Sequence, residues 1–248
     1  MTIPHLFLPP KSLQEEEIVI QGERAFYLLD VLRLRRGERV YLMDGEGAYF
    51  LAELTSASKG KAVLKIIARE WRERKPPLII SAIPILKGDK TETAIRALSQ
   101  MGISTFFPFT SERTIVKLNE KRKRQKEERW QKLAMEEAEL SCSPFYPQIK
   151  YIRSFQDIFN ELSDVPILIA YEEATREKGG FLYSLPERIA LITGPEGGFS
   201  EREIEFAKEK GAFIVSLGEN IISAEFAPIV FATLILFFYR FDIPLRVL

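Results

Sequence analysis

The sequence is poor in the two residue types that most often build metal sites and catalytic triads. Its 248 residues include one cysteine, Cys142, and one histidine, His5. A single cysteine excludes an internal disulfide and a cysteine-built metal centre, and it is typical of a reducing compartment. A single histidine excludes a histidine metal cluster and argues strongly against a Ser-His-Asp triad. We therefore expect no metal and a cytoplasmic location.

Neither an excess of charge nor a long apolar run is present. Lys and Arg number 35, as do Asp and Glu, so any nucleic-acid or membrane partner would have to be met by a local patch. The most apolar stretch, Phe226 to Tyr239, has 14 residues, whereas a membrane-spanning helix needs about 20. We expect a helix buried in a core or a subunit interface, and no membrane partner. The N-terminus lacks the basic region of a signal peptide.

Two kinds of pattern divide the chain. The first 70 or so residues read as short strands with turns, the clearest being a hairpin around Asp44-Gly45-Glu46-Gly47, and a short helix at 23–34 interrupts them. A charged segment ending in Pro76-Pro77 reads as a linker. Apolar runs then alternate with amphipathic helices, including a long charged one at about 118–140, which favours an α/β domain with a mainly parallel sheet. We predict domains at 1–73 and 74–248.

One glycine-rich turn, residues 194–200 (GPEGGFS), stands between an apolar strand-like run and a helix. Ser200 and Glu203 form a capping box, and Gly211 is a natural residue to end the helix. The turn therefore lies at the carboxyl edge of the sheet, where open α/β sheets bind ligands. It matches neither phosphate-binding glycine motif, and Glu196 would oppose a pyrophosphate. S-adenosylmethionine fits this turn better; the alternative is a tight turn whose glycines serve only backbone geometry.

A second glycine loop, residues 217–223 (LGENIIS), follows the next strand and should emerge at the same edge. Together the two loops could clamp a flat adenine. The segment "ITGPEGGFSEREIEFAKEKGAFIVSLG" closely resembles the SPOUT methyltransferases, and more narrowly the bacterial 16S ribosomal RNA uridine-N3 methyltransferase family (RsmE-like). "VLRLRRGERVYLMDGEGAYFLAEL" resembles that family's PUA-like domain, and "KGDKTETAIRALSQMGIS", "SERTIVKL" and "ERWQKLAMEEAE" resemble its central blocks.

The resemblance covers nearly the whole chain and carries a set of expectations. It implies a trefoil-knotted α/β SPOUT methyltransferase domain at 74–248 behind a small PUA-like RNA-binding β-barrel domain at 1–73. It implies S-adenosylmethionine bound in the knot and a homodimer. The implied reaction is methylation of N3 of uridine 1498 in 16S ribosomal RNA, with that RNA or the small ribosomal subunit as partner.

The same resemblance assigns individual residues. Glu225 and Arg113 are the candidates for catalysis. The RNA-binding candidates are Arg33, Arg35, Arg36, Lys87 and Lys117, although interleaved glutamates also allow a solvated helix face around 113–132. The cofactor candidates are Ala170, Tyr171, Thr193, Gly194, Pro195, Glu196, Gly197, Gly198, Leu217, Gly218 and Ile222.

Several charged positions of the family pattern are neutral or apolar in this sequence. Ser223 stands where the last motif has an arginine, and Phe226 stands where it has a threonine. The blocks at 97–102 and 139–143 also lose charged residues, and 26–27 reads Phe-Tyr in place of a double histidine. Two interpretations stay open. Either other cations, such as Arg113 or Lys87, serve an active methyltransferase, or the chain is a divergent non-catalytic or retargeted RNA-binding protein that keeps the cofactor fold.

Overall fold

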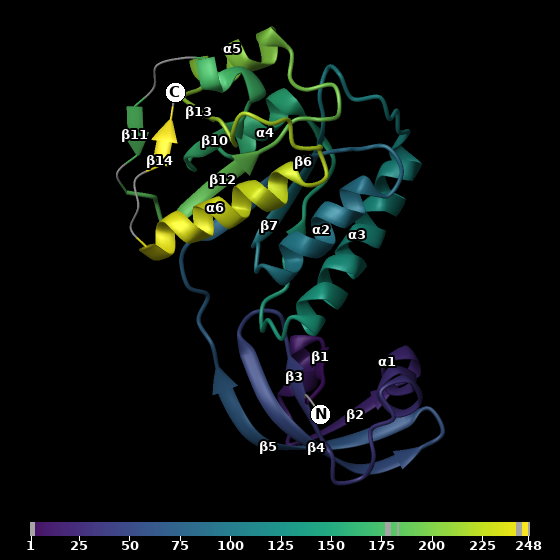
Figure 1. Cartoon of the computed structure of the whole chain (residues 1–248). Coiled ribbons are helices and arrows are strands. Elements are labelled where there is room, and N and C mark those ends of the chain that lie inside the picture. The colour runs from purple at the N-terminus through teal and green to yellow at the C-terminus, as the bar shows by residue number, and fades with distance from the viewer. Residues whose placement is uncertain (1–2, 177–179, 183, 242–244, 248) are drawn as a thin grey trace. The chain divides into compact units, whose positions relative to one another are not determined.

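The chain forms two compact units, which we describe separately. The structure is a computed structural model that describes residues 3–176, 180–182, 184–241 and 245–247. Unit 1 consists of Met1–Arg74 and Ala138–Tyr146, and unit 2 consists of Lys75–Glu137 and Pro147–Leu248 (Figure 1). Local sequence patterns do not indicate that the segment Ala138–Tyr146 packs with the N-terminal strands.

Unit 1 is built on a five-stranded sheet in the order β1-β3-β4-β5-β2. β1 pairs with β3 in parallel, and the other pairs are antiparallel. The predicted hairpin joins β3 to β4, and Asp44 Oδ1 accepts hydrogen bonds from the N–H groups of Glu46, Gly47 and Ala48. The helix expected at 23–34 is a short α-helix followed by a π-helical turn. The elements are β1 (His5–Phe7), η1 (Pro10–Leu13), β2 (Glu17–Gln21), α1 (Gly22–Phe26), η2 (Tyr27–Val31), β3 (Arg39–Met43), β4 (Ala48–Ser58) and β5 (Lys61–Trp71).

Buried polar contacts bind the segment Ala138–Tyr146 into unit 1. Glu139 Oε1 accepts a hydrogen bond of 2.7 Å from Phe7 N and lies 3.0 Å from Arg24 Nη1. The ring of Tyr146 occupies the space beside Gly45, where a Cβ would lie 1.8 Å from a ring carbon. Gly45 also has φ +84°, so position 45 requires glycine for both its backbone and this close approach.

Unit 2 contains a parallel sheet in the order β13-β10-β12-β6-β7-β8, with β9 also paired to β7. This confirms the predicted α/β class with a parallel sheet. The strands are β6 (Leu78–Pro84), β7 (Thr105–Thr110), β8 (Gln148–Ile149), β9 (Arg153–Ser154), β10 (Ile167–Ala170), β12 (Arg188–Ile192) and β13 (Phe213–Val215). A separate antiparallel pair joins β11 (Gly180–Leu182) to β14 (Leu245–Val247).

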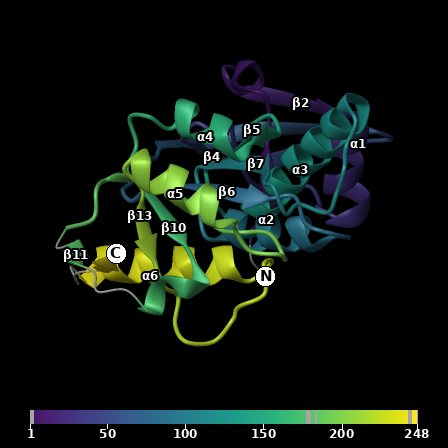
Figure 2. The same cartoon turned by 90° about the horizontal axis from the view of Figure 1, so that it is seen from above.

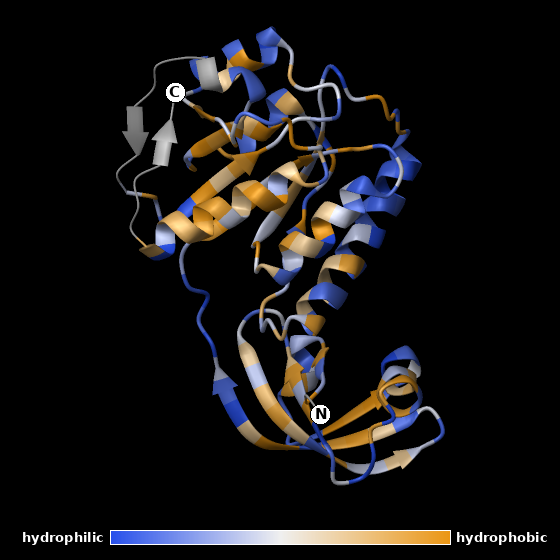
Figure 3. Cartoon of the chain, viewed as in Figure 1, coloured by the Kyte–Doolittle hydropathy of each residue, from blue (hydrophilic) through white to orange (hydrophobic). Residues whose placement is uncertain are grey.

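Helices cover both faces of this sheet, so its strands are apolar on both sides. In β6, Ile79 and Ile83 belong to one core and Ile80 and Ala82 to the other. Figure 2 shows α6 and α2 on one side of the strands and α4 and α5 on the other, and Figure 3 shows the central strands and much of α6 as hydrophobic. The helices are α2 (Lys90–Gln100), α3 (Glu120–Leu140), α4 (Phe155–Glu161), η3 (Glu172–Arg176), α5 (Glu201–Glu209) and α6 (Ala227–Phe241).

The apolar stretch near the C-terminus forms α6, as predicted, and packs against β6, β12 and α2. Phe231, Ala232 and Ile235 are fully buried, whereas Phe237 and Phe241 are exposed. Within the described ranges, no helix combines the length and the apolar character needed to cross a membrane. The trefoil knot stays a prediction, because strand order and register do not by themselves determine how a chain is threaded.

Candidate functional site

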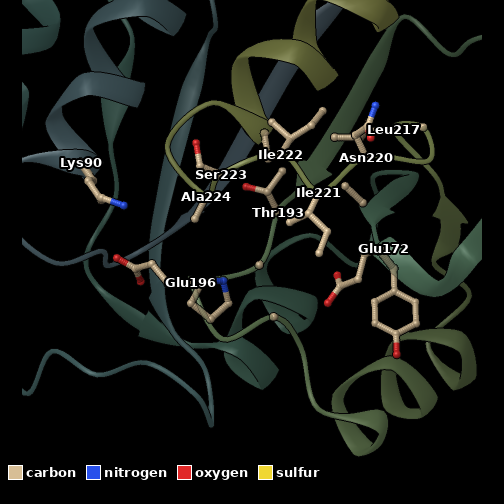
Figure 4. A pocket seen from close by; sticks show the side chains of 17 residues that line it. Lys90, Glu172, Thr193, Glu196, Leu217, Asn220, Ile221, Ile222, Ser223 and Ala224 are labelled. Carbon is tan, nitrogen blue, oxygen red and sulfur yellow. The ribbon is translucent and has the colours of Figure 1, made fainter.

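Four neighbouring strands of unit 2 end at one cavity. The loops that follow β13, β10 and β12 supply its walls together with Lys90, the first residue of the helix after β6. The cavity therefore lies at the carboxyl edge of the sheet, where the sequence predicts a ligand site. Its volume is about 310 Å³, at the lower end of the range for small-molecule sites. Figure 4 shows the side chains that line it.

The glycine turn after β12 is fixed by its own hydrogen bonds and by one buried ring. Gly198 N donates to Pro195 O at 2.9 Å, and Gly198 has φ +69°, which glycine adopts without strain. Phe199 is buried, with its ring 5.2 Å from that of Phe155 between centroids. Ser200 and Glu203 form the predicted capping box at the start of α5. The local sequence therefore determines both the path of the turn and the helix that leaves it.

Contacts from two further loops hold the turn from outside. Glu196 Oε1 accepts a hydrogen bond from Lys87 N at 3.0 Å, which links the turn to the loop after β6. Arg113 Nη1 donates to Gly197 O at 2.9 Å, and Glu112 N donates to Glu203 Oε1 at 3.0 Å. The loop after β7 is thereby bound to the glycine turn and to the N-terminus of α5.

Ten of the eleven residues predicted to contact the cofactor line this cavity. The remaining one, Gly197, belongs to the same turn, and its carbonyl faces Arg113. The ten lining residues are Ala170, Tyr171, Thr193, Gly194, Pro195, Glu196, Gly198, Leu217, Gly218 and Ile222.

The two candidates for catalysis lie beside the cavity and do not line it. Arg113 is engaged with the glycine turn, as described above. Glu225 Oε2 lies 3.3 Å from Nζ of Lys90, and Lys90 does line the cavity. A backbone hydrogen bond, followed by the neighbouring Lys90 ammonium, holds the pKa of the Glu225 carboxyl below its usual value. Glu225 is therefore ionised at neutral pH.

The charges around the cavity disfavour a polyphosphate. Two carboxylates line it, those of Glu172 and Glu196, against one cation, Lys90. Partial burial, and then the Glu173 carboxylate, raise the pKa of Tyr171, so its hydroxyl stays neutral. Thr193 is buried, and its Oγ1 has no hydrogen-bond partner among the described residues. A buried hydroxyl of this kind needs a partner, and here it borders the cavity.

Lys90 and Glu172 line the cavity without having been predicted, and Asn220 and Ile221 were named only as members of the second glycine loop. Two signals could have found the charged ones. Glu172 is the second residue after the strand that ends at Ala170, and Lys90 begins the helix that follows β6. Both positions lie at the carboxyl edge of a parallel sheet, where side chains from different strands converge.

The five residues predicted to bind RNA are all exposed, and they are divided between the units. Arg33, Arg35 and Arg36 lie in unit 1 between η2 and β3, and Lys87 and Lys117 lie in unit 2. None of their side chains forms an ion pair with a described residue. Among the same part of the chain, no group of three or more His, Cys, Asp or Glu residues could hold a metal ion.

Two family descriptions match this sequence. The first, "RNA methyltransferase domain", matches residues 73–236, and the second, "RNA methyltransferase PUA domain", matches residues 20–67. The chain is 32% identical over 221 residues to the ribosomal RNA small subunit methyltransferase E of Bacillus subtilis, covering 85% of this chain and 86% of that protein. It is 33% identical to the protein of the same name from Synechocystis, covering 91% of this chain and 74% of the relative.

A solved structure has a similar fold over nearly the whole chain. It is the ribosomal RNA small subunit methyltransferase E of Neisseria gonorrhoeae bound to S-adenosyl methionine. The TM-score is 0.82 at 26% sequence identity, and the match covers 94% of this chain and 97% of the other.

Proposed function

Because the chain belongs to the ribosomal RNA small subunit methyltransferase E family, it is an S-adenosylmethionine-dependent methyltransferase of ribosomal RNA, and we propose that it methylates N3 of a uridine in 16S ribosomal RNA. The observation that carries the proposal is the single cavity into which both glycine loops open. The uridine at position 1498 is the target that the resemblance implies.

The residues present fit S-adenosylmethionine. Glu172 and Glu196 suit a ligand with a sulfonium and an ammonium, and the cavity has no cluster of cations that would favour phosphates. Leu217, Ile222 and Ala170 offer an apolar surface for an adenine ring, and the unpartnered hydroxyl of Thr193 offers a hydrogen bond. We assign cofactor binding to the ten predicted lining residues together with Glu172 and Asn220.

Methyl transfer to uracil N3 places three requirements on the protein. The cofactor supplies a methyl group activated by positively charged sulfur. The protein must place uracil N3 in line with that methyl group, assist the loss of the N3 proton and exclude competing water. The glycine turn, fixed by Lys87 N, Arg113 and Glu203, supplies a rigid wall for the first of these tasks.

RNA binding is proposed for the exposed cations of each unit. Arg33, Arg35 and Arg36 lie within three residues of one another and have no acidic side-chain partner in the described chain. Such a cluster contacts phosphates and gives salt-dependent affinity. Lys87 and Lys117 are proposed to serve the same purpose in unit 2. Division of the chain into an RNA-binding domain at 1–73 and a catalytic domain at 74–248 is part of this proposal, with the segment Ala138–Tyr146 packed into unit 1.

A homodimer in the cytoplasm is proposed as the working form. Phe226, Phe237 and Phe241 expose aromatic surface at the start and along the length of α6. Exposed apolar surface of this kind marks a contact with another molecule. The trefoil knot around the cavity also remains part of the proposal.

Methylation of isolated small ribosomal subunits tests the function. The protein should transfer a labelled methyl group from S-adenosylmethionine to 16S ribosomal RNA, and nuclease digestion should release N3-methyluridine. Ser223 and Phe226 leave open a second interpretation, that the chain binds RNA without this catalysis. Calorimetry with the cofactor alone, combined with the methylation assay, distinguishes it from an active methyltransferase. Tight cofactor binding without transfer to any ribosomal RNA would favour a non-catalytic or retargeted RNA-binding protein.

A further inference from the structure

The cavity has one cation among the lining residues that the structure describes, and that cation is Lys90. Its side chain extends from the first residue of α2 and is 40% exposed, so its ammonium is accessible from the cavity. In Figure 4 the Lys90 side chain reaches in on the side of Glu196 and Ser223, while Glu172 and Leu217 lie on the other side.

Glu225 holds the Lys90 ammonium in place through an ion pair. Glu225 Oε2 is buried, accepts no hydrogen bond from the described residues and lies 3.3 Å from Lys90 Nζ. Lys90 supplies the opposite charge beside this buried oxygen, since an unpaired buried charge is costly. The Glu225 carboxylate is also held by a backbone hydrogen bond and by Ser223. The other nearby carboxylate, that of Glu196, is engaged through Oε1 with the backbone N–H of Lys87. Lys90 is thus held as a charged group with a defined position.

A cation in the cavity can stabilise the negative charge that develops on the uracil during the reaction. When uracil loses its N3 proton, the negative charge spreads onto the two carbonyl oxygens beside N3. A preorganised donor aimed at one of those oxygens stabilises this charge, and such a donor is worth a factor of about 10² to 10³ in rate. Ser223, at the position of the family pattern's arginine, also lines the cavity and carries no charge. Lys90 is the described lining residue that can supply one.

We propose that Lys90 is a catalytic residue that donates a hydrogen bond from Nζ to a carbonyl oxygen of the target uracil, and that Glu225 is its positioning residue. The inference rests on the proposed function and adds to it. Uracil N3 releases its proton to water, and the N3 electron pair forms the bond to the methyl carbon. The carbon–sulfur bond breaks with its electron pair remaining on sulfur, so the by-product is S-adenosylhomocysteine. Lys90 donates a hydrogen bond and transfers no proton in this step.

Four variants and one matched control test this role. Lys90→Met removes the charge, and Lys90→Arg keeps it. Glu225→Gln releases the lysine, and the double variant Lys90→Met/Glu225→Gln removes both charges so that no buried carboxylate is left alone. The control is Lys210→Met, because Lys210 lies at the C-terminal end of α5 over the ring of Phe206 and outside this cavity. Thermal melting confirms that each variant is folded.

Calorimetry and single-turnover methylation give the two readouts. We expect Lys90→Met and the double variant to bind S-adenosylmethionine and S-adenosylhomocysteine within about 3-fold of wild type, yet to transfer methyl at least about 100-fold more slowly at neutral pH. The deficit should shrink as pH rises, since hydroxide then ionises the uracil without help. Lys90→Arg should keep part of the rate, Glu225→Gln should lose about 10-fold, and Lys210→Met should match wild type.

Two results would overturn the inference. One is an equal loss of affinity for both cofactor forms in Lys90→Met, which would make Lys90 a clamp for the cofactor's carboxylate. The other is wild-type methyl transfer by Lys90→Met at neutral pH. Failure of the proposed function is a separate outcome, in which the wild-type protein itself binds cofactor but methylates no ribosomal RNA.

Discussion

At the scale of single residues, the hydroxyl of Thr193 is a candidate hydrogen-bonding group for the cofactor. It is buried beside the cavity and has no partner in the described chain. Thr193→Val removes the hydroxyl and keeps the shape. We expect the melting temperature to stay the same or rise, because a buried unsatisfied group is lost, while the dissociation constant of S-adenosylmethionine rises about 3- to 10-fold through loss of one neutral hydrogen bond.

Ser99→Ala is the control for this change. Ser99 Oγ is also buried and unpartnered, but it lies outside the cavity on α2. Calorimetry on both variants checks the prediction. Equal cofactor affinity in wild type and Thr193→Val would show that the hydroxyl has no role in binding.

A second residue-scale prediction concerns His5 and the stability of unit 1. Its Nε2 lies 2.6 Å from the hydroxyl of Tyr49, and its ring stacks on Tyr41. Burial, and then the positive charge of Arg72, lower the pKa of His5 from its usual value of 6.5, against an opposing contact with Ile3. The unfolded chain therefore takes up a proton first as pH falls. The histidine's contribution is complete above about pH 6.5 and is lost as pH falls toward the lower native pKa.

Hydrogen exchange of the segment Met1–Arg74 measures this effect. Protection should fall between about pH 7.5 and 5.5 in wild type, and less steeply in His5→Gln, which cannot titrate in that range. Identical slopes in the two proteins would mean that His5 does not control the acid sensitivity of unit 1.

Some residues of the candidate site could be predicted from the sequence and others could not. The glycine loops and their neighbours could be predicted because each lies within a short motif beside a recognisable strand. The pair Lys90 and Glu225 could not, since 135 positions separate its members in the sequence and a β12–α5–β13 unit intervenes. Only the order of strands in the folded sheet brings the two together.

At the scale of elements, the capping boxes of α4 and α5 can be compared directly, because only α5 begins at the glycine turn. Ser154 caps α4 and Ser200 caps α5, each with reciprocal hydrogen bonds to the third helical residue. Either serine-to-alanine change should destabilise unit 2 by about 1 kcal/mol. Only Ser200→Ala should also weaken cofactor binding, because Ser200 continues directly from the glycine turn. Urea denaturation and calorimetry on the pair check this, and equal cofactor affinity in the two variants would contradict it.

The elements that the sequence predicted well have strong periodicity and clear ends. The strand at Arg188–Ile192, the helix at Glu201–Glu209 and the hairpin in unit 1 all follow from local patterns. The helix Phe155–Glu161 was missed because seven residues complete too few turns for a pattern to stand out. The two-residue strands β8 and β9 exist through pairing with β7, which no local pattern encodes.

At the scale of the whole molecule, the segment Ala138–Tyr146 changes how the chain is divided. Sequence patterns change character near residue 74, so they suggest a single boundary. In the structure the last residues of α3 and the segment that follows them belong to unit 1. Glu139 and the fit of Tyr146 against Gly45 hold them there. A contact of this kind depends on one ion pair and one ring, which composition cannot reveal.

The proposed homodimer gives a prediction at the same scale. Phe226 and Phe237 are about half exposed, and Phe237 packs edge-on or tilted against Phe238 and Phe241. Phe237→Glu should raise the dimer dissociation constant at least about 30-fold, the effect of losing roughly 2 kcal/mol at an aromatic anchor. Sedimentation velocity measures this. Phe26→Glu, at an exposed aromatic residue of unit 1, should leave the dimer intact, and a monomeric wild type would refute the proposal.

The central claim is that this chain methylates N3 of a uridine in 16S ribosomal RNA. Mass spectrometry of that RNA, from cells with and without the gene, tests it most directly. We predict that N3-methyluridine disappears from one site when the gene is absent, and returns with the wild-type protein but not with Lys90→Met. An unchanged level of N3-methyluridine in the absence of the gene would contradict the claim.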